Sequence, residues 1–172
     1  SHLNKTVRIR LEVSPEIQAV LESQSKICNK VHNLVVEACI IGRDNFKATG
    51  IKNPDFNPND IYSIRDKAVE LKQTYPIIKS VFSSVIKNVG LNVGRATKAH
   101  FQTGANYPTY RDYDEKGFYT MRYEDPFVGY KIEDDQLKLS LGMQLALNKK
   151  NELKPKRISI KIRLRNKITF DL

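Results

Sequence analysis

The segment 4–20, NKTVRIRLEVSPEIQAV, contains both kinds of secondary structure expected in this chain. Over residues 7–13 apolar side chains alternate with charged ones, which is the period-two pattern of a strand with one buried face. The next three residues, Ser14, Pro15 and Glu16, supply a helix N-cap, a proline at the first helical position and an acid in the first turn. A strand is therefore predicted to lead directly into a helix.

Apolar residues then recur at helical spacing from Ile17 to Ala38, which predicts a long amphipathic helix that ends at Gly42. The only two cysteines, Cys28 and Cys39, lie in this helix, separated by about 16 Å along its axis. That separation is too large for a disulfide bond. Buried, reduced thiols are therefore expected, which favours a cytoplasmic location.

Two more helices are predicted in the middle of the chain. Glycine and proline among Asn and Asp predict a loop over 43–59. A second helix is predicted from near Asp60 to a point before Pro76, and a third helical pattern covers 77–101. Within that third pattern two glycines occur four residues apart, at positions 90 and 94, and they would let another backbone approach closely.

After residue 104 the pattern changes to short aromatic and β-branched segments divided by turn signals. The predicted strands are 118–123, 127–132, 136–141 and 157–164, with a hairpin turn at 133–135 and a loop at 149–155. The order of strand, helices and strands predicts an α+β chain, in which a β-barrel or sheet domain is interrupted by a helical insertion. The expected divisions are 1–14 for the first strand, 15–104 for the insertion and 105–172 for the remaining strands.

The chain of 172 residues has a formal net charge of +10, and this excess is concentrated in two places. Residues 147–172 contain nine Lys and Arg against two Asp and Glu, a net +7. Residues 79–122 contain seven bases against three acids, a net +4. Clustered bases favour a polyanionic partner, usually nucleic acid, because binding releases condensed counterions. The alternative is a solvated basic surface that serves solubility.

Two basic patterns lie within these segments. On the third predicted helix, Lys87, Arg95 and Lys98 fall on one face opposite the valines. The last predicted strand alternates isoleucine and leucine with bases, among them Lys161, Arg163 and Arg165. Bases repeated on one sheet face repel one another, which is more easily tolerated when an anion covers them.

Aromatic residues are interleaved with bases between residues 107 and 123, where Tyr107, Tyr110, Arg111 and Arg122 occur. Aromatic rings stack on bases while Arg and Lys bind phosphates, so this composition suits single-stranded or RNA-containing ligands. Packing of the rings in a core is the alternative interpretation.

Catalytic patterns are sparse, and no run of apolar residues is long enough to span a bilayer. The histidines have no partners at metal-ligand spacing, and His32 is expected to be a surface residue. A small Mg²⁺-dependent nuclease remains an alternative. Its acid and lysine residues would be Asp134, Asp135, Glu152 and Lys154.

Five short segments resemble the TnpB family of transposon-encoded RNA-guided DNA endonucleases, also called putative transposases, which are related to compact type V CRISPR effectors. ATKAHF at 96–101, YPTYR at 107–111 and the segment 118–123 are similar to that family's A-x-K-x-F-F, F-P-x-F-K and S-F-x-Y motifs. QLKLSLG at 136–142 is similar to the family's g-x-l-k-L-p-x-l-G motif, and the segment 157–165 is similar to its i-k-x-v-x-i-x-r strand. In this chain Tyr stands for Phe at 107 and 110, and Arg111 stands for Lys.

The resemblance implies a small, wedge-type β-barrel interrupted by a three-helix recognition insertion. It implies guide RNA and target double-stranded DNA as partners, and it puts Tyr62, Ser83 and Lys87 near the DNA motif that flanks the target. The RuvC-like nuclease domain, with its Mg²⁺, is expected beyond this segment, so neither catalysis nor a cofactor is expected from this chain. A stand-alone DNA- or RNA-binding regulator, or a ribonucleoprotein subunit, is the alternative.

Residue patterns and resemblance together predict one set of nucleic-acid contacts. The set is Arg8, Arg10, Tyr62, Ser83, Lys87, Arg95, Lys98, Tyr107, Tyr110, Arg111, Arg122, Lys161, Arg163 and Arg165.

Overall fold

The computed structural model describes residues 6–126, 128–133, 136–139, 143–147, 157–163 and 167–171. The chain forms two compact units. The first, called the sheet unit below, comprises Ser1–Lys26 and Phe118–Leu172, and the second, the helical unit, comprises Ile27–Gly117. Helices and strands are both present, so the α+β prediction is confirmed.

The strands of the sheet unit form one antiparallel sheet in the order β2-β6-β7-β1-β5-β4-β3. Their bounds are Arg8–Glu12 for β1, Met121–Tyr123 for β2, Tyr130–Glu133 for β3, Gln136–Leu139 for β4, Met143–Leu147 for β5, Ile158–Arg163 for β6 and Lys167–Asp171 for β7. Strands β2 and β3 lie at the two ends of this order, and over the described residues no pairing joins them. The sheet is therefore open there and not a closed barrel.

The alternating pattern of the first strand is confirmed. Ile9 and Leu11 of β1 are buried, whereas Arg8, Arg10 and Glu12 are exposed. The hairpin of β3 and β4 is also confirmed, because Glu133 pairs with Gln136, although the predicted turn residues 134 and 135 lie outside the described residues. The sequence prediction missed strands β5 and β7.

Helix α1 (Pro15–Thr49) is longer than predicted. Gly42 lies inside this helix, which continues past it to Thr49. Phe56 and Pro58 pack beside the glycine, where a Cβ atom would be 3.4 Å from the ring of Phe56 and 3.5 Å from Pro58. The helix ends instead at Gly50, which has a φ of +67° and donates its N–H to the Phe46 carbonyl. The predicted end at Gly42, and the loop from residue 43, are therefore wrong.

Helix α2 (Ile61–Thr74) begins where the sequence predicts, since the carboxylate of Asp60 accepts the N–H of Tyr62 at 3.0 Å. The third helical pattern is divided into a short 3₁₀ helix, η1 (Pro76–Ser80), and α3 (Ser83–Thr103). A four-residue turn, α4 (Tyr113–Lys116), completes the helical unit. In the described part of the chain, no helix combines the length and the apolar character needed to cross a membrane.

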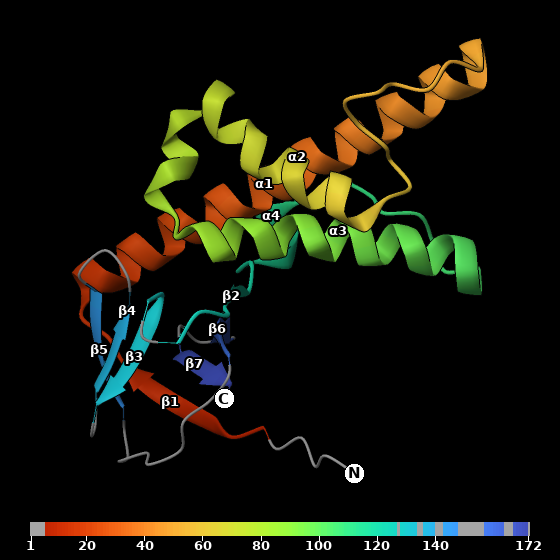
Figure 1. The fold of residues 1–172 in the computed structure, drawn as a ribbon. Coiled ribbons are helices and arrows are strands. Elements are labelled where there is room, and N and C mark those ends of the chain that lie inside the picture. The colour runs from red at the N-terminus through yellow and green to blue at the C-terminus, as the bar shows by residue number, and fades with distance from the viewer. Residues whose placement is uncertain are drawn as a thin grey trace. The chain divides into compact units, whose positions relative to one another are not determined.

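Helices α2 and α3 pack with almost no space between their backbones (Figure 1). A Cβ atom at Gly90 would lie 2.8 Å from the Cα of Arg65 and 3.0 Å from the Cβ of Ala68. One at Gly94 would lie 3.1 Å from the Cα of Ile61. The predicted close approach at these two glycines is confirmed, and a larger residue at position 90 would force the helices apart.

Substitution of Gly90 by Ala should therefore destabilise the protein, by about 1–3 kcal/mol, which is typical of overpacking. Gly42→Ala is the matched control, because that Cβ would make only ordinary contacts and alanine favours a helix over glycine by about 1 kcal/mol. The free energies of unfolding are measured by urea denaturation. Equal stability of the two variants would contradict the close packing.

The buried cysteines of α1 should be unreactive in the folded protein. Both thiols are free, and burial raises the pKa of Cys28 and of Cys39 to about 12. Since the thiolate is the nucleophile, Ellman's reagent at pH 8 should label neither cysteine until urea unfolds the chain, when both should react. Rapid labelling without urea would contradict the burial of these thiols.

Candidate nucleic-acid interface

The helical unit contains a long stretch without any acidic residue. Residues 71–111 include no Asp or Glu but carry six bases, Lys72, Lys79, Lys87, Arg95, Lys98 and Arg111. This stretch runs from the last turn of α2 through η1 and α3 into the segment that follows. Acids flank it at Glu70 and Asp112, so Lys79, Lys87, Arg95 and Lys98 in its interior are the bases without an acid close in sequence.

Three of these lysines form a crowded group, called the lysine corner below: Lys72 at the end of α2, Lys79 in η1 and Lys87 in α3. The pKa of Lys72 is lowered, first by partial burial and then by the positive charges of Lys87 and Lys79. The positive charges of Lys79 and Lys87 are therefore felt at the ammonium group of Lys72. Lys72 and Lys79 were not among the predicted contacts, although the absence of acids around them was visible in the sequence.

The basic stripe predicted on α3 is present. Lys87, Arg95 and Lys98 are exposed, whereas Val85, Val89 and Val93 on the opposite face are buried. The guanidinium of Arg95 donates to Asn92 one turn earlier. Ser83 is exposed at the first position of α3.

Tyr107 takes part in a packed aromatic cluster rather than presenting a free ring. The guanidinium of Arg43 lies 4.6 Å from its ring centroid, and the ring of His100 meets it edge-on at 5.3 Å. Burial raises the pKa of Tyr107, and the charge of Arg43 partly opposes this. Core packing, the alternative weighed for these rings, therefore accounts for Tyr107. Tyr110, in contrast, is 58% exposed.

Arg111 is held by two asparagines one turn apart on α1. Its N–H donates to the Oδ1 of Asn33 at 2.7 Å, and its carbonyl accepts from the amides of Asn29 and Asn33, each at 2.9 Å. Its guanidinium donates to the Oδ1 of Asn29 at 2.7 Å. Arg111 therefore anchors the segment after α3 to α1, and a role toward nucleic acid stays a prediction.

His32, predicted to be a surface residue, is half-buried in the structure. One of its ring nitrogens, Nε2, is hydrogen-bonded to the carbonyl of Thr109 at 3.2 Å. Burial lowers the pKa of His32, and the charge of Arg111 lowers it further, against the opposite effect of the Thr109 carbonyl. His32, Asn29 and Asn33 thus form one row of α1 that binds the segment containing Arg111.

In the sheet unit, the pairing register brings the predicted bases of three strands into neighbouring rows. One row runs across four strands: Arg122 of β2, Ser159 of β6, Asp171 of β7 and Arg8 of β1. In the next row, Lys161 of β6 and Arg10 of β1 both pair with Thr169.

Beyond these two rows, Arg163 of β6 pairs in register with Lys167 of β7. Arg122 is already engaged in an ion pair with Glu124 at 3.0 Å. Arg165 lies outside the described residues.

Among the residues that the structure describes, no three His, Cys, Asp or Glu side chains come close enough to hold a metal ion. The alternative magnesium site uses Asp134, Asp135, Glu152 and Lys154, which all lie outside the described ranges. The structure therefore does not test that alternative.

Comparison of the sequence with protein-family models and with curated proteins gives no relative for this chain. No protein-family model matches it, and no curated protein is significantly similar to it in sequence. The resemblance to TnpB proteins therefore depends only on the short segments quoted above.

The lowered pKa of His32 predicts that the protein loses stability in mild acid. The unfolded chain binds a proton at its ordinary pKa near 6.5, whereas the folded chain resists that proton, so the free energy of unfolding should fall between pH 7.5 and 5.5. One such group contributes at most about 1.4 kcal/mol per pH unit. His32→Gln should flatten this dependence in urea denaturation, and an unchanged slope would contradict the assignment.

Proposed function

We propose that this chain binds nucleic acid, and that the exposed bases of the helical unit form its main contact surface. The observation that supports this proposal best is the lysine corner, at the start of a stretch of 41 residues without a single acid. Crowding Lys72 against Lys79 and Lys87 is unfavourable in the free protein. A phosphate near the three ammonium groups would remove that repulsion and release counterions.

Two further surfaces supply other parts of the contact. The stripe of Lys87, Arg95 and Lys98 continues from the lysine corner along α3. In the sheet unit, Arg10 of β1 and Lys161 of β6 both pair with Thr169 of β7, the strand between them. The stripe on α3 lies in the basic segment 79–122, and Lys161 lies in the basic segment 147–172.

The TnpB resemblance supports a more specific form of the proposal. In that form the chain acts as the N-terminal region of a TnpB-like RNA-guided DNA endonuclease, with the open sheet unit in the place of its wedge domain and the helical unit as its recognition insertion. Guide RNA and target double-stranded DNA would be the partners, and cleavage with its Mg²⁺ would belong to a separate RuvC-like domain. A stand-alone nucleic-acid-binding regulator shares the first part of the proposal but not this one.

Fluorescence anisotropy with a 30-nucleotide hairpin RNA and a 30-base-pair DNA duplex, across a salt series, tests the proposal. Binding should weaken with salt, by a slope of about 0.9 per phosphate contacted in duplex DNA. Replacing Lys72, Lys79 and Lys87 together by Gln should reduce affinity about tenfold or more at 0.1 M salt, and should lower that slope.

The matched control replaces three other exposed lysines of the helical unit, Lys47, Lys52 and Lys116, by Gln. This control variant has the same net charge as the triple variant of the lysine corner. An equal loss of affinity in both would show that net charge alone matters. Binding without any salt dependence would overturn the proposal.

A further inference from the structure

A cleft of about 550 Å³ lies between the start of α2 and the last turns of α3. All of its lining residues belong to the helical unit: Asn59, Asp60, Ile61, Tyr62, Lys98, Phe101 and Gln102. The cleft therefore combines two aromatic rings with an amine, a carboxylate and amide groups. None of the sequence patterns brought these residues together.

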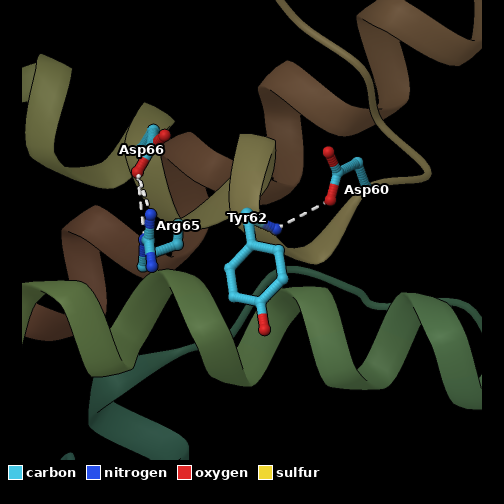
Figure 2. A network of polar contacts seen from close by, with 4 residues as sticks. All are labelled: Asp60, Tyr62, Arg65 and Asp66. Atoms are coloured by element: carbon cyan, nitrogen blue, oxygen red, sulfur yellow. Dashed lines mark hydrogen bonds and ion pairs between the residues drawn. The ribbon is translucent and has the colours of Figure 1, made fainter.

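Tyr62 has a large exposed side chain, and Arg65 packs against its ring. Tyr62 is 62% exposed, and the guanidinium of Arg65 lies 5.1 Å from the centroid of its ring (Figure 2). Arg65 is in turn held by Asp66. The Nε of Arg65 donates to the Oδ1 of Asp66 at 3.0 Å, and the Nη2 of Arg65 lies 2.9 Å from the same oxygen. Arg65 thus supports the ring, and much of the Tyr62 surface stays open to a ligand.

The two walls of the cleft are held at a fixed spacing. The close contact of Gly94 with Ile61 lies directly beside the lining residues and pins the start of α2 against α3. The N–H of Tyr62 is bound by the Asp60 carboxylate. A ligand would therefore enter a site that needs little rearrangement of its backbone.

The polar groups of the cleft have capacity left for a ligand. Asp60 uses Oδ1 for the N-cap bond, but a carboxylate has about four acceptor positions. Lys98 is exposed, and in the described part of the chain no carboxylate lies within 4.0 Å of its ammonium group. Phe101, 55% exposed, provides a second aromatic surface.

We propose that this cleft binds one unpaired guanine base of a nucleic-acid strand. The inference rests on the proposed nucleic-acid binding and names the ligand of one particular site. In it, the base stacks on Tyr62, its Watson–Crick edge faces Asp60, and Lys98 binds the adjoining phosphate.

The carboxylate is the reason for choosing guanine. Asp60 is acceptor-only when ionised, so it favours a base edge rich in N–H donors. Guanine offers two adjacent donors there, the N1–H and the N2 amine, whereas the edges of the other bases offer fewer donors to a carboxylate. Because Asp60 is negative, a phosphate is expected at the Lys98 side of the cleft and not beside the α2 N-cap.

The test uses 15-nucleotide single strands of thymidine with one central guanine, inosine or abasic residue, and the same set in uridine RNA to distinguish the two kinds of strand. Anisotropy gives the dissociation constants. Guanine should bind about 5- to 100-fold more tightly than the abasic position, the range expected for stacking of one base. Inosine, which lacks the N2 amine, should fall between them.

Three variants separate the roles of the residues. Tyr62→Ala should abolish the preference for guanine over the abasic site, while Tyr62→Phe should retain it, since stacking needs only the ring. Asp60→Asn preserves an N-cap residue, so the helix should remain intact, but the guanine and inosine strands should then bind equally. Ile51→Ala, which removes an exposed apolar side chain outside the cleft, is the control and should change nothing.

The outcomes separate this inference from the proposed function. Salt-dependent binding of all strands with equal affinity would overturn the guanine site and leave nucleic-acid binding standing. A preference for guanine that survives in Tyr62→Ala would also overturn the site. Absence of binding to any strand, to the hairpin RNA and to the duplex would overturn both.

Discussion

The contact between α2 and α3 is the constraint on which the helical unit depends. At Gly90 the backbone of α2 lies so near that even a methyl group would collide with the Cα of Arg65. Glycine destabilises a helix by roughly 1 kcal/mol relative to alanine, so the packing that the close approach allows must offset this loss. Ile64, Ala68, Val89 and Val93 are all buried in this unit.

Two surface features depend on that contact. At one end of the helix pair, the short connection through η1 brings the lysines of α2, η1 and α3 near one another. At the other end, the contact at Gly94 sets the width of the cleft between Asp60 and Phe101. The packing of α2 against α3 thus determines both where the three lysines come together and where the aromatic rings of the cleft stay exposed.

The sequence predicted those parts of the fold that have a local signal. The alternation of β1, the Asp60 cap and the small face of α3 can each be recognised within a few residues. The end of α1 was missed because Gly42 carries the usual stop signal but finds a tertiary partner in Phe56, and the helix continues to Gly50. Strands β5 and β7 carry short alternating patterns, MQLAL and KITFD, that could have been recognised.

The candidate site was less predictable, because its contacts join residues far apart in sequence. The basic stripe of α3 followed from helical periodicity alone. The roles of Arg111 and His32 could not, since both depend on pairing between α1 and a segment nearly eighty residues later. Nor could the sequence show that Arg43 covers one tyrosine while another, three positions on, stays exposed.

That second tyrosine, Tyr110, has a further consequence. The residues on both sides of it are tied to α1, Thr109 through its carbonyl and Arg111 through both of its backbone groups. The backbone of Tyr110 is therefore already ordered although the segment has no regular secondary structure. A ligand that contacts its ring would have to restrict only side-chain torsions, and the larger loss of backbone conformational entropy has been met during folding.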